Sequence, residues 1–118
     1  MKKLKIDAVA QQFNISTTTI RYYEREGLLG PVKRVNGIRE FEATDLDRID
    51  FILCVKACGM TLGQIKHFLA IYQQGDATVA ERLAILQDQL VQSEEKVKQL
   101  KQSMKHLKIK IEDVKALM

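Results

Sequence analysis

The chain has 118 residues, of which 46% are hydrophobic and 29% are charged, a balance typical of a small globular protein and not of a disordered chain. No stretch approaches the ~18 consecutive apolar residues of a membrane-spanning helix, so no membrane partner is expected. The net charge is +4, and residues 1–42 hold eight Lys and Arg against five Asp and Glu while residues 43–118 hold eleven against ten, so the basic excess lies in the first third and favours a polyanionic partner there.

Two short helices are predicted at the start of the chain. Apolar residues at helical spacing indicate a helix over residues 6–13, which a tight turn at Asn14 follows. Ser16 is the predicted cap of a second helix, and Gly27 provides its left-handed stop. This pattern predicts a helix-turn-helix over residues 5–27, with the second helix as the candidate recognition helix.

The second helix carries residue types that suit DNA. Thr17, Thr18, Arg21 and Tyr22 fall on its polar side, where hydroxyls can bind phosphates and an arginine can reach a base edge. Tyr23 lies three residues after the apolar Ile20, so a place in the core and a DNA contact are equally open for it.

A hairpin is predicted over 33–41, within a wing spanning 32–42, because Asn36-Gly37 suits a type I′ turn that needs positive φ at both positions. In that register Val35 faces Ile38 and Arg34 faces Arg39. Like charges directly opposite are destabilising, and a phosphate between the arginines would remove the conflict. The alternative is that both arginines extend into solvent.

Two further helices are predicted over residues 44–58 and 62–74. Thr44 is the predicted cap of the first, and Thr61 with Gln64 forms a capping box for the second. The predicted buried stripe of the first helix is Leu46, Ile49, Ile52, Leu53 and Ala57.

A capping box at Thr78 and Glu81 predicts a long helix that runs towards residue 118. Ten of its eleven heptad positions are apolar and Ser93 is the exception, which favours a coiled coil. At ~1.5 Å per residue the helix exceeds about 50 Å, so it needs a partner helix, most simply from a second copy of the chain. The predicted dimerisation residues are Leu83, Leu86, Leu90, Val97, Leu100, Met104, Leu107, Ile111 and Val114.

The runs IRYYEREGLL and PVKRVNGIREF, followed by the long helix, resemble the MerR family of winged helix-turn-helix regulators. The resemblance implies a mainly α fold, with a DNA-binding head over residues 1–75 and an antiparallel coiled-coil dimer over 76–118. It also implies a near-palindromic promoter that the dimer bends and untwists, acting only indirectly on RNA polymerase. The sequence departs from the family at Ile38 and Phe41, where tyrosine is usual. The combined candidate DNA contacts are Ser16, Thr17, Thr18, Arg21, Tyr22, Tyr23, Arg34, Asn36, Gly37 and Arg39.

Within that family, FILCVKACGM and IYQQGDATVAERLAIL resemble the NmlR/AdhR-like subgroup, which implies a response to reactive aldehyde, electrophile or nitrosative stress through Cys54. The local chemistry does not favour a Cys54 thiolate, because Asp50 lies one turn before it, Cys58 lies one turn after it, and the helix C-terminus is near. Activation would have to come from elsewhere, for example from the partner chain. Cys54 as a sensor and Cys54 as a structural residue, with a metal or small molecule as the signal, both remain open.

Other classes are not expected. Cys54 and Cys58 are too few for a disulfide framework, and no apolar run follows the basic N-terminus, so the sequence predicts a cytoplasmic protein without a signal peptide. With only two distant histidines, His67 and His106, no metal site is expected in one chain and no cofactor is implied. No nucleophile and base accompany a pocket, so an enzyme is not expected. A pure coiled-coil adaptor would leave the wing arginines without a role.

Overall fold

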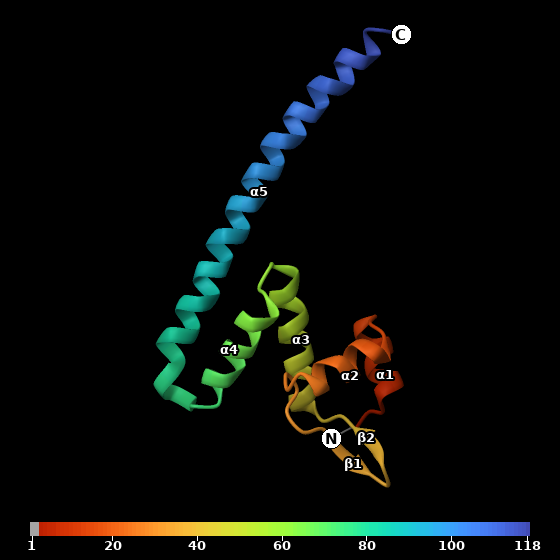
Figure 1. The fold of residues 1–118 in the computed structure, drawn as a ribbon, viewed down its shortest axis with the longest axis vertical. Helices are drawn as coiled ribbons and strands as arrows, with labels where there is room; N and C mark the ends of the chain where they lie inside the picture. Colours follow the sequence, from red (N-terminus) through yellow and green to blue (C-terminus); the bar gives the residue numbers. More distant parts are fainter. Residues whose placement is uncertain (1–2) are drawn as a thin grey trace.

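The structure is a computed structural model that describes residues 3–118 and is mainly helical (Figure 1). A head made of four short helices and a two-stranded hairpin is followed by one long helix that extends away from it. The elements are α1 (Ile6–Phe13), α2 (Thr17–Arg25), β1 (Lys33–Val35), β2 (Ile38–Glu40), α3 (Ala43–Ala57), α4 (Leu62–Tyr72), the 3-10 helix η1 (Gly75–Thr78) and α5 (Val79–Lys115).

The helix-turn-helix forms for the local reasons that the sequence indicated. Asn14 ends α1 in the left-handed conformation with φ of 54°, and its N–H bonds to the Gln11 carbonyl. The Ser16 hydroxyl caps α2 by accepting from the Thr19 N–H at 3.1 Å. Gly27 follows α2 with φ of +79°, a conformation that side chains rarely adopt. The turn from Asn14 to Ser16 thus sets the angle between α1 and α2, and Gly27 directs the chain away from α2 towards the wing.

The core of the head lies where α1, α2, the wing base, α3 and α4 meet. Phe41, directly after β2, is fully buried and makes a two-way backbone bridge with Leu4, whose N–H and carbonyl lie 3.1 and 2.8 Å from their partners. The wing is thus fastened at its base to the start of the chain. The largest fully buried side chains are Tyr23, Phe41, Ile20, Leu28, Ile49, Ile52, Ile65 and Val9.

The prediction that Thr44 caps α3 was wrong. Glu42 is the cap: its carboxylate accepts from the N–H of Asp45, and the Asp45 carboxylate accepts from the N–H of Glu42 at 2.8 Å. This reciprocal box satisfies two backbone donors that the helix itself leaves unpaired. Thr44 lies one residue inside the helix and is exposed.

The predicted buried stripe of α3 was also wrong at its end, because Ala57 is exposed and Val55 is buried. The chain leaves α3 through Gly59, with φ of +100°, and the Met60 N–H bonds back to the Val55 carbonyl at 3.0 Å. This Schellman-type ending folds the buried Met60 over Val55, so the turn selects Val55 for the core.

Thr78 holds the N-cap position of α5, but the predicted capping box with Glu81 is wrong, because the Thr78 side chain makes no capping hydrogen bond. The chain enters α5 through η1, which turns the Thr78 side chain inward, so that it is only 6% exposed. Its hydroxyl donates to the Ile71 carbonyl at 2.7 Å and accepts from Arg82 Nε at 3.0 Å. Thr78 therefore fastens the end of α4 to the start of α5.

The helix α5 has 37 residues, which corresponds to about 55 Å, and only its first part packs on the head, through Ile85 and Leu86. Beyond that, Gln89 Nε2 and Ser93 Oγ both donate to the Cys58 carbonyl, at 2.6 and 3.1 Å. Ser93, the one polar residue at a heptad position, therefore bonds to the head of its own chain. No helix among residues 3–118 combines the length and the apolar content needed to cross a membrane.

Candidate nucleic-acid interface

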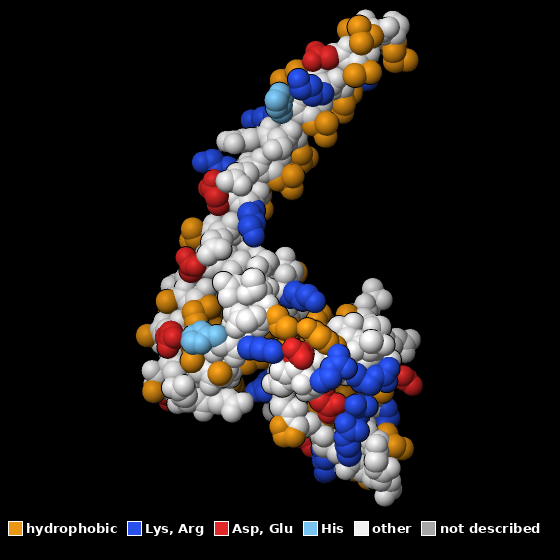
Figure 2. Space-filling view, viewed as in Figure 1, with side chains coloured by type: hydrophobic (Ala, Val, Ile, Leu, Met, Phe, Trp, Pro, Cys, Tyr) orange, Lys and Arg blue, Asp and Glu red, His pale blue; other side chains and the backbone are white. Residues whose placement is uncertain are grey.

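Lysine and arginine side chains gather over the helix-turn-helix and the wing (Figure 2). The hairpin of β1 and β2 projects from the head next to α1 and α2 (Figure 1). The basic excess that the sequence places in residues 1–42 is therefore collected on one part of the surface. A duplex with one negative charge per ~1.7 Å of axis is the polyanion that such a surface suits.

On α2, the predicted polar contacts share an accessible side. Thr18 and Arg21 are exposed, and Arg21 Nη2 donates to Thr17 Oγ1 at 3.1 Å, which holds the guanidinium along the helix. The Ser16 hydroxyl is already used by the cap and lies 2.9 Å from Thr19 Oγ1. Ser16 is exposed as well, but its hydroxyl is engaged by the cap, so Thr18 and Arg21 are the side chains best able to reach a duplex.

The two tyrosines of α2 differ in their surroundings. Tyr22 is half-buried, and the Arg25 guanidinium lies 5.5 Å above its ring. Tyr23 is only 2% exposed and belongs to the core, with Lys56 Nζ 5.8 Å from its ring centre. The Tyr23 ring is thus a packing element, so only its hydroxyl is left as a candidate DNA contact.

The wing has the register that the sequence predicts. Lys33 pairs with Glu40, Arg34 with Arg39 and Val35 with Ile38. Asn36 and Gly37 form the exposed tip, with φ of 52° and 78°, as a type I′ turn requires. The tip therefore presents a small polar side chain and a glycine, one residue pair away from the cross-strand arginines.

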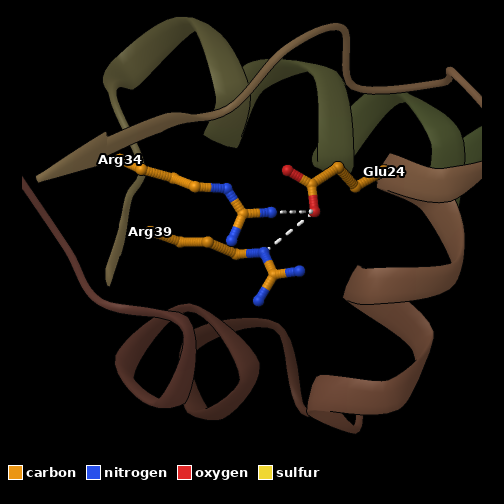
Figure 3. A network of polar contacts seen from close by, with 3 residues as sticks. All are labelled: Glu24, Arg34 and Arg39. Carbon is orange, nitrogen blue, oxygen red and sulfur yellow. Dashed lines mark hydrogen bonds and ion pairs between the residues drawn. The ribbon is translucent and has the colours of Figure 1, made fainter. Parts of the chain in front are cut away.

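The sequence left two arrangements open for Arg34 and Arg39, a phosphate between them or both side chains in solvent, and the structure shows a third. The Glu24 carboxylate of α2 lies between them, and its Oε1 accepts from Arg39 Nε at 2.8 Å and from Arg34 Nη2 at 3.4 Å (Figure 3). The repulsion between the two arginines is relieved within the chain, because α2 and the hairpin, ten to fifteen residues apart in sequence, meet here. Glu24 is the residue that sequence reasoning missed; the signal for it was a lone carboxylate in the second half of the basic run TTTIRYYER.

Cys54 and Cys58 are both exposed, free thiols at the end of α3. The Cys58 N–H donates to the Cys54 carbonyl at 3.2 Å, and the Cys58 carbonyl in turn accepts from Gln89 and Ser93 of α5. The turn that carries both thiols is therefore joined to the long helix. Within residues 3–118 no group of three or more His, Cys, Asp or Glu side chains could hold a metal ion.

Hydrophobic side chains line one side of α5 beyond the head (Figure 2). The predicted dimerisation residues form an apolar stripe along the whole of α5 at heptad spacing, and Leu83 and Leu86 lie in its first part. Leu86 is half-buried against the head. The others are exposed, with Leu100 at 62%. The exposed members of the stripe are Leu83, Leu90, Val97, Leu100, Met104, Leu107, Ile111 and Val114.

Comparisons with known proteins agree with this geometry. Residues 4–70 match the model of the MerR HTH family regulatory proteins, and residues 46–109 match the model described as MerR, DNA binding. The HTH-type transcriptional regulator AdhR of Bacillus subtilis is 39% identical over 87 residues, which make up 73% of this chain and 62% of AdhR. The chain thus spans under two thirds of that relative's length.

Solved structures support the same fold. HiNmlR, described as a MerR family regulator lacking the sensor domain and bound to promoter DNA, is 33% identical with a TM-score of 0.81, over 87% of this chain and 79% of that one. A MerR family regulator from Bacillus thuringiensis is 29% identical with a TM-score of 0.83, over 93% and 97% of the two chains.

Proposed function

This chain belongs to the MerR family of DNA-binding transcriptional regulators, and we propose that it binds a near-palindromic promoter element as a homodimer and controls transcription by distorting that element. The observation that carries the proposal is the accessible basic surface formed by α2 and the wing. A helix of that size fits a major groove, and a basic hairpin tip suits the adjacent backbone or minor groove. Deforming the duplex changes the spacing of promoter elements, which would act on RNA polymerase without direct contact.

The homodimer is supported by the apolar stripe on α5. An exposed row of leucine, valine, methionine and isoleucine at heptad spacing is stable in water only when another surface covers it. A second copy offers a stripe of the same length and spacing. We therefore assign residues 1–75 to the DNA-binding head and 76–118 to the dimerisation coil. Two heads at a fixed separation would then read two half-sites.

Replacement of Arg21 by alanine tests the recognition helix. We expect affinity for the native target to fall about tenfold to a hundredfold, because a good arginine contact to a base edge contributes on the order of 1–3 kcal/mol. Fluorescence anisotropy at several salt concentrations would measure it, with a duplex that native protein selects from a random pool.

Lys98→Ala is the matched control, because it removes one exposed cation from the part of α5 that lies beyond the head. It should leave affinity within about twofold of the native value, since only screened long-range charge is lost. Equal losses in the two variants would show that Arg21 acts only through its charge. No loss in Arg21→Ala would contradict the assignment of α2 as the recognition helix.

For the signal, we propose that reactive aldehydes, other electrophiles or nitrosative stress modify Cys54. With an α,β-unsaturated aldehyde, the sulfur forms a bond to the β-carbon, the thiol loses its proton, and a proton is added to the α-carbon. The carbon–carbon double bond is consumed, so the addition needs no redox partner. Two observations support the proposal: the Cys54 thiol is exposed, and its turn is joined to α5 through the Cys58 carbonyl. An adduct on Cys54 would change the packing of this turn against α5, the helix that sets the distance between the two heads.

Cys54→Ser is expected to abolish induction of a reporter by such an aldehyde while leaving DNA affinity unchanged. Mass spectrometry of the treated native protein should locate the adduct on Cys54. Cys58→Ser is the matched control, because it removes the neighbouring thiol and keeps the backbone carbonyl that α5 binds. If Cys54→Ser responds like the native chain, then Cys54 is structural and the signal is a different one, such as a metal or another small molecule.

A further inference from the structure

The wing is held to α2 by a single carboxylate. Glu24 Oε1 lies 2.8 Å from Arg39 Nε and 3.4 Å from Arg34 Nη2, with one arginine on each strand of the hairpin (Figure 3). The Glu24 side chain is 16% exposed and that of Arg39 is 23% exposed. Solvent screens fully exposed ion pairs so strongly that they contribute little to stability. Partial burial of Glu24 and Arg39 weakens this screening, so the two bonds can hold the wing in position against α2.

Few other contacts fix the orientation of the wing. Its strands have three residues each, and every side chain from Lys33 to Ile38 is exposed. Its base is fastened by the bridge between Leu4 and Phe41, and Lys5 lies 4.0 Å from Glu40. Among residues 3–118, the hydrogen bonds and ion pairs between α2 and the wing all go through Glu24.

The two arginines are held unequally. Arg39 uses Nε for the short bond, so its two terminal nitrogens remain directed away from Glu24 (Figure 3). Arg34 makes the longer bond with one terminal nitrogen, and its side chain is 47% exposed. Each guanidinium has five N–H donors, so both can bind a phosphate without leaving the carboxylate.

From this geometry we propose that Glu24 is a positioning residue that sets the specificity of DNA binding: it holds the wing at one distance from α2 and does not itself touch the duplex. The inference rests on the proposed contact of α2 and the wing with DNA. A specific complex requires the helix and the hairpin to meet neighbouring grooves at once, and a wing that is already oriented loses less entropy on binding. A non-specific complex uses only the charge of the surface and gains nothing from that orientation.

Removal of the Glu24 charge therefore has opposite effects on two kinds of duplex. Fewer negative charges on a basic surface strengthen attraction to any polyanion. Loss of the fixed wing weakens only the complex that needs both elements in register. A role limited to electrostatics predicts tighter binding to every duplex, whereas the positioning role predicts a lower ratio of specific to non-specific affinity.

The test compares Glu24→Gln with the native chain on a duplex selected by the native protein and on a shuffled duplex of the same composition. We expect affinity for the selected duplex to fall about five- to tenfold, which is the size of one lost base-pair preference, and affinity for the shuffled duplex to stay equal or rise. Glu26→Gln is the matched control: it removes the same charge two residues away in the chain, where Glu26 binds Lys66 Nζ at 3.0 Å and not the wing. It should leave the affinity ratio unchanged.

A second variant and a mutant cycle separate positioning from folding. Glu24→Asp keeps the charge with a shorter reach, so the specificity ratio should decrease in the order native, Asp, Gln, while thermal unfolding shows that all three fold. Arg39→Ala should lower the ratio in the native chain and have little further effect in Glu24→Gln, because coupled residues are not additive.

The outcomes distinguish this inference from the proposed function. If Arg34→Ala leaves binding to both duplexes unchanged, the wing does not contact DNA and the proposed function is wrong. If Arg34→Ala weakens binding but Glu24→Gln tightens it equally on both duplexes, as Glu26→Gln does, Glu24 acts only by charge and the positioning role is overturned.

Discussion

Leu100→Glu is expected to convert the protein to a monomer and to lower its affinity for a near-palindromic duplex about a hundredfold to ten-thousandfold. Leu100 lies within the apolar stripe of α5 and is 62% exposed in the single chain, so in a coiled coil it would be buried against the partner. A glutamate there would place two uncompensated charges in the seam, which opposes pairing. Loss of the second head removes the effective concentration that a linked pair of heads provides.

The matched control for this variant is Gln99→Glu. It adds the same charge at the neighbouring exposed position, which lies off the seam. Sedimentation velocity at micromolar concentration should show a dimer for the native chain and for Gln99→Glu, and a monomer for Leu100→Glu. A native chain that is itself monomeric at that concentration would refute the coiled-coil dimer, and so would a Leu100→Glu variant that remains dimeric and binds as before.

Tyr23→Ala is expected to lower the free energy of unfolding by about 3–5 kcal/mol, the usual cost of removing a buried aromatic ring. The ring is 2% exposed and packs in the core between α2 and its neighbours. Domains of this size are stable by only about 5–15 kcal/mol, so a large part of that free energy of unfolding would be lost. Urea denaturation followed by far-ultraviolet circular dichroism would measure the change.

Tyr23→Phe separates the ring from its hydroxyl. Because the ring is kept, the free energy of unfolding should change by less than about 1 kcal/mol. If the hydroxyl contacts a phosphate, affinity for every duplex should fall by a similar factor, since phosphates carry no sequence information. A Tyr23→Phe variant with native affinity would restrict Tyr23 to packing. A stable Tyr23→Ala variant would contradict the burial of the ring.

Local rules explain why much of the head was predictable. Asn14 and Gly27 end helices because their backbone angles suit a left-handed stop, and Asn36-Gly37 turns the hairpin for the same reason. These signals act between neighbours in the chain, so they can be read without knowing the fold. The register of the wing followed directly, including the opposition of Arg34 and Arg39.

The error at Thr44 is local, because the Glu42 and Asp45 box places the cap of α3 two residues earlier. The other errors lie where distant elements meet or where a helix ending redirects the chain. Val55 replaced Ala57 in the core because a Schellman-type turn brings Met60 over it. Thr78 bonds to the Ile71 carbonyl because η1 turns it inward, although its spacing from Glu81 is that of a cap. The periodicity of apolar residues specifies which residues share a helix face. The position of the neighbouring element decides which of those residues become buried.

By itself, the sequence determined the order of the α-helices and strands, the type I′ turn of the wing, the apolar stripe of α5 and the basic character of the first third, because each depends on residues close together in the chain. Only the tertiary structure decided that Glu24 lies between the wing arginines, that the Tyr23 ring belongs to the core, and that Gln89 and Ser93 bind the Cys58 carbonyl. The last two bonds join residues 31 and 35 positions apart. Such partners are chosen by how the packed elements approach one another, and no local spacing in the chain specifies that approach.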